Sequence, residues 1–134
     1  MMAPWVYQKA RAEAALHIQL RWEAGEPPMG TQTSVRIHGR IERIFRDRTG
    51  ALHCGQKIVF TVPVISSFVD ADPTPGSAIY HSWERLRRTR WLEGFFEWDG
   101  ELHLVHSQVA PILGPTEEPV CGPEQEGFLC TGNI

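Results

Sequence analysis

The chain has 134 residues, of which 42% are hydrophobic, and its formal net charge is -3. This length favours a single domain with a substantial buried core, and the small net charge by itself predicts no anionic partner. No apolar run approaches the length of a transmembrane helix, which excludes a membrane-spanning protein. The N-terminus lacks the apolar core of a signal peptide. We therefore expect a cytoplasmic location, or a secreted one if a leader precedes this sequence.

The N-terminal part of the chain predicts a helix followed by a strand. The segment from Trp5 to Ala15 is rich in helix-forming residues, and Pro4 suits the first turn of a helix. From Leu16 to Glu23, apolar and polar residues alternate, which is typical of a half-buried strand. A weak apolar stripe should pack the helix against the sheet, and it consists of Trp5, Val6, Lys9 and Ala12.

The segment from Thr33 to Val64 carries the clearest architectural signal. From Val35 onward apolar residues alternate with polar ones, as in an antiparallel strand with one buried face. This alternation slips at Glu42, which predicts a bulge near Arg43. Gly39 in mid-strand indicates a bend or the close approach of another backbone. A long strand that is both bent and bulged is typical of a small closed barrel.

Two breaks surround the next strand. Asp47 to Gly50 predicts a turn, and the strand from Lys57 to Val64 follows it. Pro63 cannot donate a hydrogen bond, so it belongs at the end or edge of that strand. The segment from Asp70 to Gly76 reads as a loop, and a short strand is a candidate from Ala78 to His81.

The second half of the chain predicts a short helix and a hairpin. Trp83 to Arg90 should form one or two helical turns with Trp83 and Leu86 facing the core. Trp91 to Trp98 predicts a strand that is apolar on both faces. Asp99-Gly100 is a strong hairpin signal, and Glu101 to His106 should form the returning strand. A closing segment follows from Val109 to Leu113.

This order of elements predicts a mainly β fold. We expect a five-stranded OB-like Greek-key barrel with an N-terminal helix and a short helix between strands 3 and 4. The barrel domain should occupy residues 1–113. Residues 114–134 are rich in Pro, Gly and Glu and predict a tail.

Four segments carry a resemblance to a known type of OB-fold. They are ARAEAALHIQLRW, RIERIFRDRTG, KIVFTVP and LEGFFEWDGELHL. Together they resemble the netrin module found in tissue inhibitors of metalloproteinases. Those proteins inhibit through an N-terminal cysteine, whereas this chain has Met1 there and its cysteines at Cys54, Cys121 and Cys130. The resemblance therefore implies a topology and a non-catalytic binding module, and no inhibitory residue is transferred.

The sequence offers little support for catalysis or metal binding. It contains no G-x-S-x-G, P-loop or H-E-x-x-H motif. Glu93 and Glu97 should lie on one exposed strand face about 13 Å apart, too far for a glycosidase pair. His103 and His106 should point to opposite faces of their strand. A zinc site would need Cys54 to meet a second cysteine in space, so we expect no catalytic residue, metal or cofactor.

Two surfaces are candidate binding sites. The first is the polar face of the bent strand, with Arg36, His38 and Arg40 and with Arg21 and His17 alongside. OB-folds bind single-stranded nucleic acid on such a face. We nevertheless favour a solvated face on which Arg36 forms an ion pair with Glu42 or Glu93, since charged strand faces usually pair across strands.

The second surface combines arginines and tryptophans, as interaction hot spots do. Its members are Trp83, Arg85, Arg87, Arg88, Arg90 and Trp91. It would suit an acidic partner, a phosphate, or this chain's own Glu117 and Glu118. We therefore expect a non-catalytic module that binds a protein or small ligand, with single-stranded nucleic-acid binding as the alternative. The candidate ligand-binding residues are Arg36, His38, Arg40, Trp83, Arg87, Arg90 and Trp91.

Overall fold

The computed structural model describes residues 4–25, 34–65 and 81–120. Its helices are α1 (Pro4–Glu13) and α2 (Trp83–Thr89). Its strands are β1 (Leu16–Gly25), β2 (Ser34–Asp47), β3 (Lys57–Ile65), β4 (His81–Ser82), β5 (Trp91–Trp98) and β6 (Leu102–Ile112). The loop expected from Asp70 to Gly76, the start of the candidate strand at Ala78, and two cysteines, Cys121 and Cys130, lie outside the described residues.

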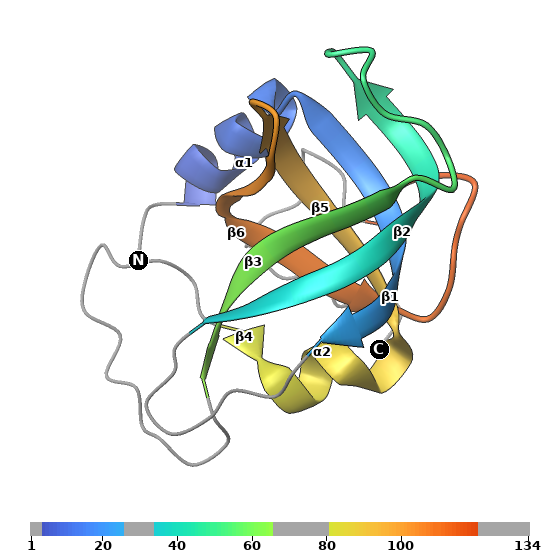
Figure 1. Cartoon of the computed structure of the whole chain (residues 1–134). Helices are drawn as coiled ribbons and strands as arrows, with labels where there is room; N and C mark the ends of the chain where they lie inside the picture. The colour runs from blue at the N-terminus through green and yellow to red at the C-terminus, as the bar shows by residue number, and fades with distance from the viewer. Residues whose placement is uncertain (1–3, 26–33, 66–80, 121–134) are drawn as a thin grey trace.

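The strands form one sheet in the order β4-β3-β2-β1-β5-β6. All neighbouring pairs are antiparallel except the short β3–β4 pair. The sheet curls until β3 lies against β6, so the barrel is nearly closed, and α2 lies at one end of it (Figure 1). This arrangement confirms the predicted mainly β, OB-like barrel with its two helices. Within the described ranges, no helix is long and apolar enough to cross a membrane.

The barrel core consists of the inward-facing residues of the alternating strands. From β1 it takes Leu16, Ile18, Leu20 and Trp22, and from β2 it takes Val35, Ile37 and Ile41. The two helix residues predicted to face the core, Trp83 and Leu86, are also buried. Each such large apolar side chain contributes about 1.5–3 kcal/mol by its burial, which explains why the two-residue alternation is so strict.

The long strand β2 is bent and bulged as predicted. In its pairing with β1, Glu42 is an extra residue between Ile41 and Arg43, next to the predicted position. Two further register shifts occur in the same pair, which leave Phe45 unpaired on β2 and Glu23 unpaired on β1. A Cβ on Gly39 would lie 2.8 Å from the carbonyl oxygen of Arg21. Gly39 therefore permits the close approach of the β1 backbone at the bend.

The buried residues of α1, and Ala14 directly after it, differ from the predicted stripe. Tyr7, Arg11 and Ala14 are buried, whereas Trp5 is 66% exposed. Arg11 is buried because its guanidinium NH1 donates a 2.7 Å hydrogen bond to Oε1 of Gln108 on β6. A charged residue can occupy such a face when a partner satisfies it, and the apolar pattern alone did not show this partner.

The chain after the hairpin also differs from expectation. Val109 and Ile112 belong to β6 and are buried, so this segment is a continuation of the strand. Leu113, expected in the same closing segment, is 67% exposed. Further along, the backbone N–H of Thr116 donates to Oε1 of Gln19, which holds this part of the chain against the outside of the sheet. The domain boundary at residue 113 stays a prediction.

Candidate ligand-binding site

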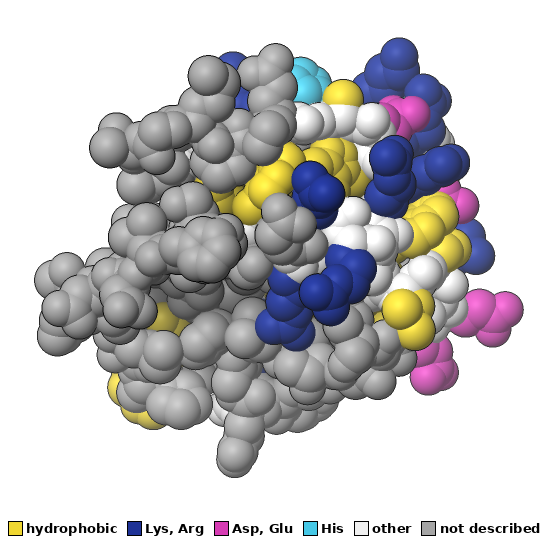
Figure 2. Space-filling view, turned by 90° about the horizontal axis from the view of Figure 1, so that it is seen from below, with side chains coloured by type: hydrophobic (Ala, Val, Ile, Leu, Met, Phe, Trp, Pro, Cys, Tyr) yellow, Lys and Arg dark blue, Asp and Glu magenta, His cyan; other side chains and the backbone are white. Residues whose placement is uncertain are grey.

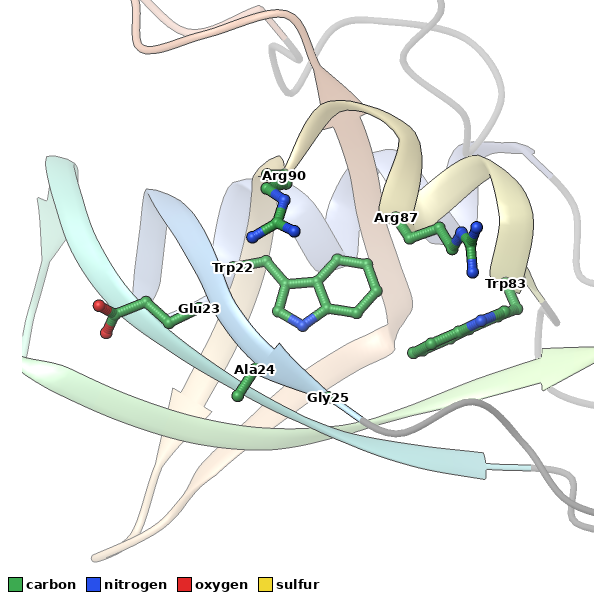
Figure 3. Close-up of a pocket in the computed structure, with 7 residues that line it drawn as sticks. All are labelled: Trp22, Glu23, Ala24, Gly25, Trp83, Arg87 and Arg90. Atoms are coloured by element: carbon green, nitrogen blue, oxygen red, sulfur yellow. The ribbon is translucent and has the colours of Figure 1, made fainter.

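A pocket of about 440 Å³ lies where the end of β1 meets α2 (Figure 3). This volume is within the range of sites that hold small molecules. The pocket unites three of the predicted site residues, Trp83, Arg87 and Arg90, with a fourth residue, Trp22, that was not predicted to belong to a site. Its lining residues are Trp22, Glu23, Ala24, Gly25, Trp83, Arg87 and Arg90.

Two tryptophans form the floor of this pocket. The rings of Trp22 and Trp83 meet edge to face, with centroids 5.0 Å apart, and both side chains are largely buried. The backbone N–H of Trp22 donates a 2.7 Å hydrogen bond to the carbonyl oxygen of Arg90, which ties β1 to the end of α2. The indole N–H of Trp83 is buried and has no hydrogen-bond partner among the described residues.

Two arginines form the rim of the pocket. Arg87 and Arg90 are exposed, and their guanidinium groups lie close to the two tryptophan rings (Figure 3). The carboxylate of Glu23 points away from them and forms an ion pair with Nε of Arg40 at 3.4 Å. From this end of the molecule, Lys and Arg side chains lie beside patches of exposed hydrophobic surface, whereas Asp and Glu lie toward the right-hand side of the view (Figure 2). The pocket therefore offers positive charge beside aromatic surface.

Trp91 lies apart from this pocket. Its ring is half-buried and carries the guanidinium of Arg21 at 5.9 Å from the ring centroid. The two residues face each other across the β1–β5 pair. The predicted Arg/Trp surface is thus divided between the pocket at α2 and this cation–π pair on the sheet.

The bent-strand residues Arg36, His38 and Arg40 lie on the outer face of β2, away from the pocket. Arg36 and His38 are exposed, while Arg40 is half-buried and donates to the carbonyl oxygen of Gly55 at 3.2 Å. On this face Arg40 forms an ion pair with Glu23, whereas Arg36 forms none with the residues that the structure describes. The predicted Arg36–Glu93 pair is wrong, because Glu93 is buried on β5.

A second, smaller groove of about 180 Å³ lies beside the bent strand. Arg36, Lys57 and Trp98 line it together with Glu101 and the surrounding backbone. The sequence analysis did not assign Trp98 to this surface. Trp98 reaches the groove because the nearly closed barrel brings the β5–β6 turn next to the start of β3. In the sequence, the Asp99-Gly100 hairpin signal directly after Trp98 was the indication that Trp98 lies at this turn.

A buried polar cluster occupies the outer face of β1 and β5, where exposed residues were predicted. Glu93 is 1% exposed and His17 is 2% exposed. The Glu93 carboxylate accepts hydrogen bonds from Nε2 of Gln19 at 2.7 Å and from the backbone N–H of Val120 at 3.0 Å. Nε2 of His17 lies 3.0 Å from the same carboxylate. The predicted exposure of Glu93, and the placement of His17 beside Arg36, are therefore wrong.

The physical reason is that other parts of the chain cover this face. Phe95 stacks on the His17 ring with centroids 4.0 Å apart, and Ala14 and Val120 pack nearby. Buried polar groups need partners, and here they find them in each other and in the backbone. Because the cluster is closed to solvent, we regard it as structural.

Neither a known family nor a metal-binding cluster accounts for these sites. No protein-family model matches the chain, and no curated protein matches it. In the part of the chain that the structure describes, no three His, Cys, Asp or Glu residues are grouped so that they could hold a metal ion. The functional argument therefore rests on the geometry of the pocket and the groove.

Proposed function

We propose that the protein is a non-catalytic binding module that holds an anionic ligand in the pocket between β1 and α2. The ligand is a small molecule or an acidic group of a partner protein. The observation that carries this proposal is the meeting of two arginines and two tryptophans in one pocket. Among the described lining residues, Glu23 is the single carboxylate, and it is paired with Arg40.

The chemistry of these residues supports an anion with attached apolar surface. A guanidinium group donates two parallel hydrogen bonds to a carboxylate or phosphate. Tryptophan supplies a large contact area whose shape is already fixed by packing. Residues of both kinds dominate the energy of many interfaces, so the pocket combines charge recognition with an apolar floor.

A titration with the aromatic anion anilinonaphthalene sulfonate tests this proposal. We expect its fluorescence to rise with saturation, and Arg87→Ala or Arg90→Ala to weaken binding roughly tenfold, as loss of a charged hot-spot contact does. Arg88→Ala is the matched control, because Arg88 lies in the same helix, is equally exposed, and does not line the pocket. Equal effects of Arg87→Ala and Arg88→Ala would refute the proposal.

A second candidate function is single-stranded nucleic-acid binding in the groove beside β2. The observation that favours it is the position of Trp98, which supplies an aromatic ring next to Arg36 and Lys57. Stacking on an aromatic ring and basic contacts to phosphates are the two elements that such sites need. Glu101 in the same groove opposes phosphate binding, which is why this function ranks second.

Fluorescence anisotropy with a labelled oligo-dT tests the second candidate. If it holds, binding weakens steeply as salt is raised, and Trp98→Ala and Arg36→Ala each reduce affinity, while Arg88→Ala has little effect. The absence of binding at low salt would remove this candidate and leave the pocket proposal untouched.

A netrin-like relationship and a cytoplasmic location are further proposals. The first rests on the strand order, the N-terminal helix and the proline near the end of β3. The second is supported by Cys54, which is an exposed free thiol, since reduced cysteines are usual in the cytoplasm.

A further inference from the structure

The backbone of Arg90 is unusual among the described residues. Its φ is 62°, and the other non-glycine residue with positive φ is His106. Arg90 directly follows α2, at the position where helices often end on a glycine in the left-handed conformation. A residue with a Cβ is strained there, whereas glycine is not. His106 has a local explanation, because it lies in β6 where the pairing with β5 shifts register between Gly94 and Phe96.

An arginine at position 90 needs a compensating role. Strained backbone conformations persist where the surrounding structure holds them in place, and they cluster at functional sites. Here the side chain of Arg90 is placed over the pocket, and its carbonyl oxygen is fixed by the N–H of Trp22 (Figure 3). Arginine near a helix C-terminus also offsets the partial negative charge of the last carbonyls. Arg88 already lies in the last turn of α2 and could serve that purpose from outside the pocket.

The presence of both Arg87 and Arg90 in the lining of one pocket indicates the class of anion. A carboxylate is satisfied by the two-pronged donor of one guanidinium. A phosphate group carries a charge of about -1.5 to -2 and three acceptor oxygens, so it can engage two guanidinium groups at once. The tryptophan floor then favours a flat ring attached to that phosphate.

We infer that the pocket binds a phosphate attached to a flat ring, as in a mononucleotide or an aryl phosphate. Arg87 and Arg90 hold the phosphate, and Trp22 and Trp83 contact the ring. This inference rests on the proposed function, because it names the ligand class of the same pocket.

Competition against anilinonaphthalene sulfonate tests the ligand class. The competitors are phenyl phosphate, adenosine monophosphate, benzoate, adenosine and inorganic phosphate. We expect phenyl phosphate, adenosine monophosphate or both to displace the probe at concentrations roughly tenfold lower than those needed with benzoate, adenosine or inorganic phosphate. A tenfold difference in affinity corresponds to the loss of one strong contact. The stronger of the two phosphates identifies the ring as a simple aryl group or a nucleoside. Benzoate or inorganic phosphate competing as well as both ring-bearing phosphates would overturn the inference.

The variant Arg90→Gly tests the role of the strained residue. Glycine relieves the backbone strain, so the melting temperature should rise by roughly 2–4 °C, while ring-phosphate binding weakens at least tenfold. If Arg90 served only the structure, Arg90→Gly would have a lower melting temperature than the wild type or would bind the ligand equally well. Either result would contradict the inference. Arg90→Ala keeps the strain and should lose binding without this gain.

The failures of the two proposals are distinguishable. If probe binding requires Arg87 and Arg90 but benzoate competes equally, the pocket functions and the ligand class is wrong. If probe binding is unchanged by Arg87→Ala and Arg90→Ala, the proposed function fails, and the ligand inference fails with it.

Discussion

The carboxylate of Asp47 shows how one residue organises a turn. Its Oδ1 accepts hydrogen bonds from the backbone N–H groups of Thr49 and Gly50, at 2.9 and 3.0 Å, and Oδ2 accepts one from Leu52. Desolvation raises the pKa of Asp47, but the hydrogen bonds from Thr49, Leu52 and Gly50 together outweigh it, so its pKa lies below the ordinary value. The predicted turn from Asp47 to Gly50 is thus confirmed, and Gly50 has a φ of 69°.

This lowered pKa predicts a pH-dependent contribution to stability. Because the folded-state pKa is depressed, the contribution is complete above the unfolded pKa of about 3.9 and is lost as pH falls through the folded pKa. We expect Asp47→Asn to lower the melting temperature by roughly 2–4 °C at pH 7, and the gap to the wild type to narrow below about pH 4. Thermal unfolding of both proteins across pH measures this. Asp99 also has a lowered pKa, but it is present in both the wild type and Asp47→Asn, so it does not affect the difference in melting temperature between them. A difference that became larger in acid would contradict the role given to Asp47.

The buried position of Glu93 gives a second prediction at the residue scale. Glu93→Gln keeps the shape of the side chain, and its remaining oxygen can still accept from Gln19 and Val120. Its amide nitrogen, however, replaces the oxygen that lies opposite Nε2 of His17. Leaving buried groups unsatisfied should lower the free energy of unfolding by about 1–3 kcal/mol. Urea denaturation measures this, and Glu97→Gln is the control, since Glu97 is on the same strand and exposed. Similar losses in both variants would show that the cluster does not stabilise the fold.

At the scale of elements, alternation predicted the strands well because each half-buried strand shows its burial locally. The alternating part of β2 is an example, because its burial alternates from Val35 to Ile41 as predicted. The outer faces could not be predicted in this way. Whether Glu93 is exposed depends on Val120, which is distant in sequence and comes to lie over it only in the fold. The same reason explains the missed face of α1, where Arg11 donates a hydrogen bond to Gln108 on the distant strand β6.

The bend of β2 is the element-scale feature with the clearest structural cause, and it yields a prediction. In Gly39→Ala the new Cβ would lie 2.8 Å from the carbonyl oxygen of Arg21. This oxygen belongs to the backbone of β1, so it can move away only if the strand moves with it. We expect a loss of about 1–3 kcal/mol in the free energy of unfolding, as overpacking costs, measured in urea. Gly114→Ala is the control, because nothing lies within 4 Å of its added Cβ. A loss in Gly114→Ala as large as in Gly39→Ala would contradict the close-approach explanation.

At the scale of the whole molecule, the barrel separates two possible binding surfaces. The pocket forms where β1 ends against α2, and the groove forms where the β5–β6 turn meets β2 and β3. The composition of the first surface was predicted from Trp83, Arg87 and Arg90, which are close in sequence. Trp22 and Trp98 were missed as site residues because each reaches its surface through contacts between distant segments.

The five tryptophans allow one measurement that tests the central claim directly. In a heteronuclear NMR spectrum of isotope-labelled protein, each indole N–H gives its own signal, assigned by single Trp→Phe variants. On titration with phenyl phosphate we expect saturable shifts of the Trp22 and Trp83 signals, while the signal of Trp5, which is 66% exposed and outside the pocket, stays in place. Shifts confined to Trp98, or to Trp5, with Trp22 and Trp83 unmoved would contradict the claim that the pocket at α2 is the binding site.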